Sequence, residues 1–400
     1  MHIALRPGTN DNTFDPMSNS HGKYDSHSQQ AAARPIGVSV VICCHNSAKR
    51  LPPTLQHLVA QQIRGAKWEV IVVDNSSTDD TVEVAARCWP KEQTHLFRIV
   101  QEPELGLTYA RKRGLGESSY EFVCFVDDDN WLCPTWIEDV LDLMTRHSEV
   151  AVSGGVNYAV SETPAPAWFS HCKFMWAVSV DDPLTGDITE SGLAVCGAGL
   201  TLRYSAWRRL VADGFEPLLS GRRGTSLVGN EDNELCFALR MAGWHIWVDP
   251  RLTLQHFLPS GRMTWAYARR LHRAAGMSGV ALDAYFYGDR SSPTGLRARL
   301  REHWQWQALT LLKGFLMRPI RFLRYALTAS EGANEALWVD QEIGRFLGLA
   351  RFGSDYTRCI RAVRNATWRR PKVPTLAPQP AQNKTSFEQR EPVAASDSKR

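Results

Sequence analysis

Short apolar runs alternate with helix-like stretches in the first third of the chain. Residues 38–44 and 68–73 are rich in β-branched side chains and predict two buried strands, and a third strand is expected to end at residues 99–100. Between the first two runs, apolar residues recur at helical spacing at Leu51, Leu55 and Leu58, which predicts a crossover helix. Strands joined by helices in this order predict a sheet with parallel strands and therefore an α/β fold.

A fourth apolar run, residues 122–126, leads directly into Asp127, Asp128 and Asp129. A continuous apolar run is typical of a strand that is buried on both faces. Ligands of open α/β sheets bind beyond the carboxyl ends of the strands, so we expect these carboxylates at a ligand-binding edge. If the chain stays extended, Asp127 and Asp129 point the same way and Asp128 points elsewhere. Two such carboxylates suit a hard divalent cation, although a solvated acidic turn before a helix is the alternative.

The later part of the chain contains a helix with two carboxylates in its first turn. This predicted helix ends before Gly243, and its apolar face consists of Leu235, Ala238, Leu239 and Ala242. Glu231 and Asp232 lie where the helix dipole favours negative charge, so capping is an alternative to a catalytic role. Residues 247–249 and 252–256 predict the last strands of the sheet.

The composition changes after residue 260, where Arg, Trp and helix-forming residues become frequent. The apolar stretch 303–325 is interrupted by Lys313, Arg318 and Pro319, so it is too broken for an ordinary membrane-spanning helix. It predicts either helices at the surface of an anionic membrane or a helical subdomain packed on the preceding domain. We therefore expect four parts: a disordered segment at 1–34, the α/β domain at 35–260, a helical region at 261–370 and a disordered tail at 371–400.

Composition narrows the functional classes. The net charge of +4 does not suggest a nucleic-acid partner, and neither GxGxxG nor a P-loop is present. Nine scattered cysteines without a CxxC pair argue against a disulfide framework or a zinc site and favour a reducing compartment. The N-terminal residues are polar, without the apolar segment of a secretory signal, so we expect a cytoplasmic protein.

Several motifs in a fixed order resemble those of inverting family 2 glycosyltransferases with the GT-A fold. They comprise residues 40–46, 72–79 and 125–129, then Gly197-Ala198-Gly199, residues 229–232 and His256. The resemblance covers about residues 36–280. It implies the GT-A nucleotide-diphospho-sugar transferase fold, an α/β fold with a mostly parallel central sheet flanked by helices, here with a C-terminal helical extension.

The resemblance also implies the activity. We expect metal-dependent, inverting transfer of one sugar from a UDP-, GDP- or dTDP-linked donor to a hydroxyl of a glycan or polyprenyl-linked acceptor in cell-surface polysaccharide biosynthesis. The Gln-x-x-Arg-Trp motif of processive members is missing from the sequence, so transfer should be non-processive. A peripheral location at the inner face of the cell membrane would suit such an acceptor. A nucleotidyltransferase on the same scaffold and a non-catalytic nucleotide- or glycan-binding membrane partner are the alternatives.

Roles for individual residues follow from the resemblance. Asp232 is the expected general base. The nucleotide sugar is expected to contact Cys44, Asn46, Asp74, Arg111, Asp127 and Asp128, and the acceptor Gly197, Ala198, Gly199, Glu231 and Trp168. Mn²⁺ or Mg²⁺ is expected on Asp127, Asp129 and His256. Trp168 could instead fill the core, and His256 could be a hydrogen-bonded structural residue.

Overall fold

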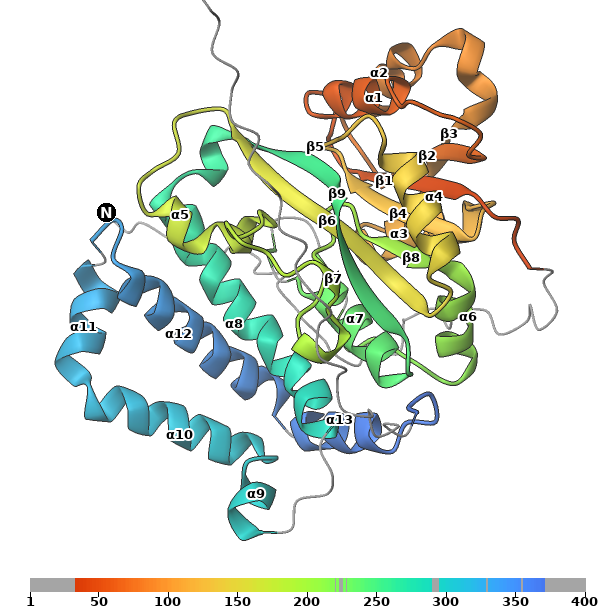
Figure 1. Cartoon of the computed structure of the whole chain (residues 1–400). Helices are drawn as coiled ribbons and strands as arrows, with labels where there is room; N and C mark the ends of the chain where they lie inside the picture. Colours follow the sequence, from red (N-terminus) through yellow and green to blue (C-terminus); the bar gives the residue numbers. More distant parts are fainter. Residues whose placement is uncertain are drawn as a thin grey trace, which may run out of the picture. The chain divides into compact units, whose positions relative to one another are not determined.

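The computed structural model describes residues 33–219, 221–222, 226–227, 229–289, 295–328, 330–353 and 355–370. The expected disordered ends therefore lie outside the described residues, apart from residues 33 and 34. A central sheet carries helices on both faces, and a group of long helices follows it in the chain (Figure 1).

The described sheet has nine strands in the order β3-β2-β1-β4-β8-β6-β9-β5, and β7 pairs with β9. The strands are β1 Val38–Cys44, β2 Trp68–Asp74, β3 Phe97–Gln101, β4 Phe122–Asp127, β5 Asn130–Leu132, β6 Val150–Ser161, β7 Gly186–Asp187, β8 Thr201–Arg203 and β9 His245–Leu258. Strands β3, β2, β1 and β4 are mutually parallel, whereas the remaining half is mixed. Cys44 lies opposite Asp74, and Cys43 lies opposite Asp127, so three strands end at one edge.

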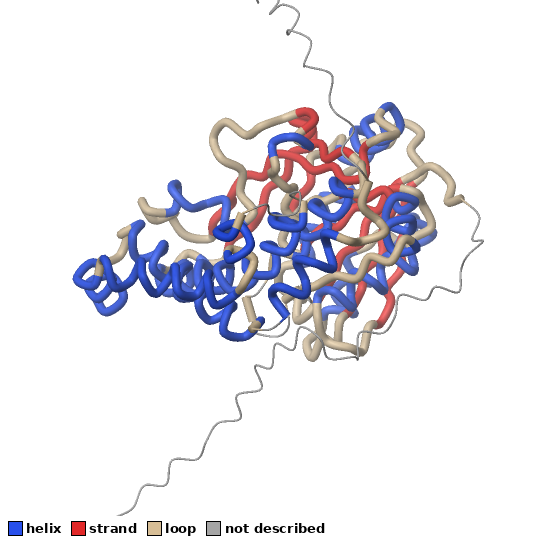
Figure 2. The backbone as a smooth tube through the Cα atoms, turned by 90° about the horizontal axis from the view of Figure 1, so that it is seen from below, coloured by secondary structure: helices blue, strands red, loops and turns tan. Residues whose placement is uncertain are grey.

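Helices connect the strands and cover the sheet. They are α1 Leu51–Val59, α2 Thr81–Cys88, α3 Leu107–Glu117, α4 Trp136–Arg146, α5 Phe169–Cys172, α6 Tyr204–Ala212 and α7 Glu231–Met241. Short 3₁₀ turns lie at η1 Lys91–Leu96, η2 Lys173–Trp176, η3 Thr189–Ser191 and η4 Ser260–Arg262. The view in Figure 2 shows the strands enclosed between helices.

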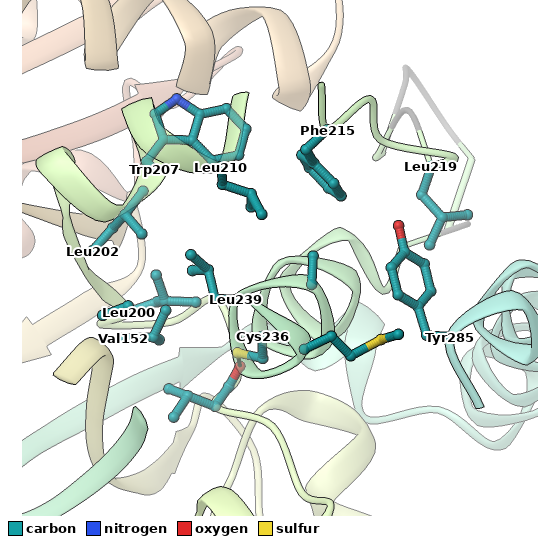
Figure 3. Close-up of a cluster of buried hydrophobic side chains, with 14 of the residues drawn as sticks. Val152, Leu200, Leu202, Trp207, Leu210, Phe215, Leu219, Cys236, Leu239 and Tyr285 are labelled. Carbon is teal, nitrogen blue, oxygen red and sulfur yellow. Dashed lines mark hydrogen bonds between the residues drawn. The ribbon is translucent and has the colours of Figure 1, made fainter. Parts of the chain in front are cut away.

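Alternate residues of each central strand face two different cores. Val41, Ile71 and Val123 join the core that contains α3 and α7, whereas their neighbours Val40 and Val70 join the core under α1 and α4. This follows from the two-residue period of a strand and explains why the runs are apolar throughout. Figure 3 shows part of the first core, where residues of the sheet, α6 and α7 meet Tyr285.

The C-terminal region consists of α8 Trp265–Gly288, α9 Leu296–Leu300, α10 Trp304–Met317, α11 Pro319–Thr328, α12 Asn334–Phe352 and α13 Asp355–Arg364. Val280, Ala284 and Tyr285 of α8, with Leu349 of α12, belong to the same core as the sheet residue Val123. The change of composition after residue 260 therefore marks a change from the α/β region to helices, and the two regions share one hydrophobic core.

One expectation about the elements needs correction. Residues 247–249 and 252–256 lie in a single strand, β9, which pairs with β6 on both sides of a register shift between Gly154 and Val156. The apolar stretch after residue 303 divides at Arg318 into α10 and α11, because Pro319 cannot continue the hydrogen bonding of α10. Within the described ranges, none of the helices combines the length and apolar character needed to cross a membrane.

Candidate active site

The chain turns immediately after β4, so the strand alternation expected for the three aspartates stops at Asp127. Asp128 turns toward α1, where its Oδ2 lies 2.6 Å from Nη2 of Arg50 and accepts a hydrogen bond from Ser47. Asp129 turns toward β9 and is 2% exposed. The expectation that Asp127 and Asp129 point the same way is therefore not supported, because the backbone between them is not extended.

Asp129 forms a charged cluster with His256 and Arg262. Its Oδ1 lies 3.4 Å from His256 Nε2, and its Oδ2 accepts a 2.9 Å hydrogen bond from Arg262. The pairing of β5 with β9 places Asn130 opposite His256, which brings these side chains together. Burial alone would raise the pKa of Asp129, but the hydrogen bond from His256 and the charges of His256 and Arg262 hold it below its usual value.

Asp232 is held at the start of α7 by backbone donors. Its Oδ2 accepts a 2.6 Å hydrogen bond from the N–H of Gly197, and its Oδ1 accepts one of 2.8 Å from Asn233. Asn230, directly before the helix, has a left-handed φ of 76° and donates a 2.7 Å hydrogen bond to Ser278 of α8. The position of this carboxylate thus depends on the Gly197 loop and on α8.

Arg111 of α3 lies between the end of β4 and the start of α7. Its Nη1 is 3.1 Å from Oε1 of Glu231, and its guanidinium lies over the ring of Phe125. Burial would lower the pKa of Arg111, but the negative charges of Glu231, Asp127 and Asp232 outweigh it and raise the pKa. A Cβ built on Gly197 would lie 2.7 Å from Arg111 Nη2, so a glycine permits this close approach.

Asp127 and Asp232 act on common neighbours. The pKa of the Cys196 thiol rises to about 12, mainly through burial and then through the charges of Asp232 and Asp127. Burial and the charge of Asp232 raise the pKa of Glu231, against the effect of Arg111. Oε2 of Glu231 is buried and has no hydrogen-bond partner among the described residues. Asp127 and Asp232 are therefore both near enough to Cys196 for their charges to affect its thiol.

The loops after β1 and β2 are tied into one rim at the carboxyl edge of the sheet. Asn46, with a left-handed φ of 52°, accepts a 2.8 Å hydrogen bond from the N–H of Thr78 and donates its own N–H to Ser77. Asp74 is 4% exposed and accepts a hydrogen bond from the N–H of Ser77. Cys44 is also buried, so its thiol is enclosed, and a ligand at the rim would meet backbone at this position.

The Gly197-Ala198-Gly199 loop lies under the same site and has little room for larger residues. Gly199 has a φ of +78°, and a Cβ there would lie 2.8 Å from the ring of Trp136. Its N–H donates to the carbonyl of Phe125, and the carbonyl of Ala198 accepts from Asn157. This sequence of glycines therefore joins the loop closely to β4.

Trp168 lies in a separate aromatic cluster rather than on an accessible surface. It is 5% exposed, its ring packs beside Phe169, Trp176 and Trp265, and its Nε1 donates to Glu331. Trp168 therefore fills the core, which was the alternative given above, and its buried ring is not available for an acceptor sugar to stack on.

Three residues near the site were not identified from the sequence. Arg50 and Arg262 pair with Asp128 and Asp129, and Asn157 of β6 supports the Gly197-Ala198-Gly199 loop through its side-chain amide. Their partners lie far away in the chain, and spacing gives no sign of such contacts. Only Arg262 had a signal, as a cation shortly after the expected ligand His256.

Asp129 and His256 are of the residue types that bind a divalent cation, and in this structure the oxygens of Asp129 face His256 and Arg262. Asp129 supplies hard carboxylate oxygens, His256 lies beside it, and Nδ1 of His256 is buried without a partner in the described part of the chain. No three His, Cys, Asp or Glu side chains gather closely enough to hold a metal among the residues that the structure describes. All nine cysteines are free thiols.

Comparison with known proteins finds a family match for the part of the chain that contains Asp127 and Asp129. Residues 39–193 match the family model described as "Glycosyl transferase family 2". The chain is 30% identical over 121 residues to "Glycosyltransferase AglE" of Haloferax volcanii, covering 30% of this chain and 40% of that protein. It is 32% identical over 101 residues to "Cholesterol galactosyltransferase" of Borreliella burgdorferi, covering 25% and 27% of the two chains. The chain thus spans well under half of these relatives.

Among solved structures, the chain is similar to the one titled "Crystal structure of GalNAc-T7 with UDP, GalNAc and Mn2+". The likeness covers 66% of this chain and 53% of that one, with 14% identity and a TM-score of 0.44. The family match ends at residue 193, so Glu231, Asp232 and His256 lie beyond it.

Proposed function

We propose that this chain, which has the GT-A fold and whose residues 39–193 match the model of glycosyl transferase family 2, catalyses metal-dependent, inverting transfer of one sugar from a nucleoside-diphosphate sugar to a hydroxyl. The observation that supports the proposal is the position of Arg111, which pairs with Glu231 at 3.1 Å and whose pKa is raised by the charges of Glu231, Asp127 and Asp232. In this proposal a donor-binding edge and a proton acceptor from a later helix share one site.

In this proposal Asp232 takes the proton of the acceptor hydroxyl. A carboxylate is a weak base toward an alcohol, so proton transfer should accompany attack on the sugar carbon rather than precede it. The backbone N–H of Gly197 holds Oδ2 of Asp232 and so orients the base. Glu231, with one oxygen on Arg111 and the other unpartnered among the described residues, is suited to accept a hydrogen bond from the acceptor.

The donor would lie along the rim formed by the loops after β1, β2 and β4. Asp74 and Asn46 are proposed to contact the nucleoside part, and Arg111 to contact the diphosphate. Asp129 and His256, with Asp127, would hold Mn²⁺ or Mg²⁺. When bound, such an ion neutralises the charge that develops on the leaving diphosphate. Displacement in one step needs no covalent sugar intermediate.

The acceptor is proposed to be a glycan or polyprenyl-linked glycan used in cell-surface polysaccharide biosynthesis, with the reaction at the inner face of the cell membrane. This part of the proposal rests on the family and on the character of the C-terminal helices. The two relatives described above act on acceptors of their own, and their names do not specify the acceptor of this chain.

Asp232→Asn tests the proposal. We expect transfer to fall by about 10²–10⁴-fold, because the amide cannot take the proton. Fold and donor binding should remain, since the amide oxygen can still accept the hydrogen bond from Gly197 and only the one from Asn233 is lost. Initial rates with Mn²⁺ measure transfer, and a thermal-shift panel of UDP-, GDP- and dTDP-sugars with Mn²⁺ or EDTA measures donor binding.

Asp182→Asn, which changes an exposed carboxylate, is the matched control and should leave both readouts unchanged. Full turnover by Asp232→Asn would remove Asp232 from the base role. Release of pyrophosphate from a nucleoside triphosphate would instead assign the site to a nucleotidyltransferase. Binding of a donor without turnover by the wild-type protein, with a range of acceptors, would favour a non-catalytic partner.

A further inference from the structure

Two consecutive helices of the C-terminal region expose a continuous series of large apolar side chains. We call this series the outer face; it consists of Leu309, Leu312, Leu316 and Met317 of α10 and Ile320, Leu323 and Leu327 of α11, with exposed fractions from 44% to 82%. Single exposed leucines are normal on protein surfaces, but seven large apolar residues within nineteen positions suggest a binding surface.

The orientation of α10 explains why these side chains remain exposed. Trp304, Ala308 and Leu311 pack against the main core, and they recur at helical spacing on the inner side of the helix. Leu309, Leu312 and Leu316 recur at similar spacing along an adjacent side of the helix, which is exposed. Figure 1 shows α10 and α11 as the outer helices, with α12 between them and α8. The first three side chains are thus covered by the core, whereas the three leucines are exposed to solvent.

The charges of this segment all have one sign. Residues 303–330 contain Lys313, Arg318, Arg321 and Arg324 but no Asp or Glu. Lys313, Arg318 and Arg324 are exposed beside the apolar residues of the outer face. A surface that combines leucines with cations complements the headgroups and acyl boundary of an anionic bilayer. An interface between two copies would be expected to exclude charges from its centre.

We propose that the outer face of α10 and α11 binds the surface of an anionic lipid bilayer, with its apolar side chains among the headgroups and its cations on lipid phosphates. This inference deepens the proposed function and rests on it only for its purpose, which is to bring the site to a lipid-linked acceptor. Because the two helices are short and separated at Pro319, they would lie along the surface rather than span it.

Vesicle co-sedimentation of the full chain tests the surface. We expect binding to vesicles of 70% phosphatidylcholine and 30% phosphatidylglycerol and much weaker binding to pure phosphatidylcholine. The triple variant Leu312→Glu, Leu316→Glu and Ile320→Glu should bind the anionic vesicles at least tenfold more weakly. The matched control carries Val180→Glu, Leu184→Glu and Leu193→Glu, which change three residues of 50–58% exposure elsewhere, and should bind as the wild type does.

A second variant separates the contribution of charge. Lys313→Glu with Arg318→Glu should remove the preference for phosphatidylglycerol, and raising NaCl from about 0.1 to 0.5 M should weaken the wild type in the same direction, because salt screens exposed charges. Equal binding by the wild type and the Leu312/Leu316/Ile320 variant would overturn the proposal. So would a wild-type dimer in solution that this variant converts to a monomer.

The readout for donor binding keeps the two proposals apart. The thermal shift produced by a nucleotide sugar should be the same in the wild type and in both variants, which also shows that the variants are folded. Loss of vesicle binding with an unchanged donor shift supports the surface alone. Failure of the wild type to bind anionic vesicles would contradict the proposed membrane-binding surface but not the proposed sugar transfer.

Discussion

At the scale of single residues, Arg111 joins the two acidic parts of the site. It is the partner of Glu231, and Asp127 and Asp232 contribute to the rise in its pKa. A buried carboxylate that loses its cation is costly, because neither water nor another charge replaces the partner. The stability of the site and its chemistry should therefore depend on the same side chain.

Arg111→Met should destabilise the protein by about 3 kcal/mol, since it removes the ion-pair partner of the largely buried Glu231. Urea unfolding measures this cost. The double variant Arg111→Met with Glu231→Gln should recover part of it, because the uncompensated charge is gone. Strictly additive costs in this cycle would show that the ion pair contributes nothing of its own.

Glu234 provides a prediction of pH dependence. Its buried carboxylate accepts hydrogen bonds from the N–H groups of Leu218 and Leu219 and from the hydroxyl of Tyr285. Burial outweighs these donors and raises its pKa to about 7. Because the pKa is higher in the folded than in the unfolded state, this group favours folding most below the unfolded pKa, and that stability is lost as pH rises through about 7.

The loss should reach about 3 kcal/mol between pH 4.5 and 8. Glu234→Gln cannot ionise, so its stability relative to the wild type should improve over this range, even though the amide loses one of the three hydrogen bonds. Urea midpoints at pH 5, 6, 7 and 8 measure the difference. Parallel pH profiles of the two proteins would contradict the assignment.

The sequence allowed some residues of the site to be predicted and not others. An apolar run followed by carboxylates places Asp127 at a sheet edge, because strand burial and parallel order are local properties of the chain. The pairing of Arg111 with Glu231 joins residues 120 positions apart, which no local pattern reveals. Trp168 shows the same limit, since a tryptophan in a polar loop has the same sequence whether it is buried or exposed.

At the scale of elements, the strands were predicted most closely and the helix packing least. Residues 38–44 form β1 as expected, because β-branched runs bounded by turns are strong local signals. The close packing of α8 on α12 had no such signal. A Cβ built on Gly344 would lie 1.9 Å from the carbonyl oxygen of Arg273, and one on Gly276 would lie 2.0 Å from that of Gln341.

Gly344→Ala should therefore force α12 away from α8 and cost roughly 2–3 kcal/mol of stability. Gly279→Ala on α8 is the matched control, because a Cβ there meets nothing within 4 Å. It should stabilise the protein by about 0.5–1 kcal/mol through the higher helix propensity of alanine. Unfolding in urea separates the two variants, and equal stabilities would contradict this account of the helix contact.

At the scale of the whole described chain, the sheet and the C-terminal helices depend on one another. Asp340 of α12 is fully buried and pairs with Arg269 and Arg273 of α8. Through α8 this contact continues to Ser278 and Tyr285, which are hydrogen-bonded to Asn230, directly before α7, and to Glu234 of α7. The helix that carries the proposed base is therefore supported by residues from outside the segment that matches the family.

The hydrogen bond between Tyr285 and Glu234 bears on how such proteins can be recombined. A chimaera that joined residues 35–260 of this chain to the C-terminal helices of a relative would keep Glu234 but would lose its hydroxyl donor unless the relative supplied one at the same position. The two regions therefore cannot be exchanged independently, and a stable hybrid would need its interface redesigned around the carboxylate of Glu234.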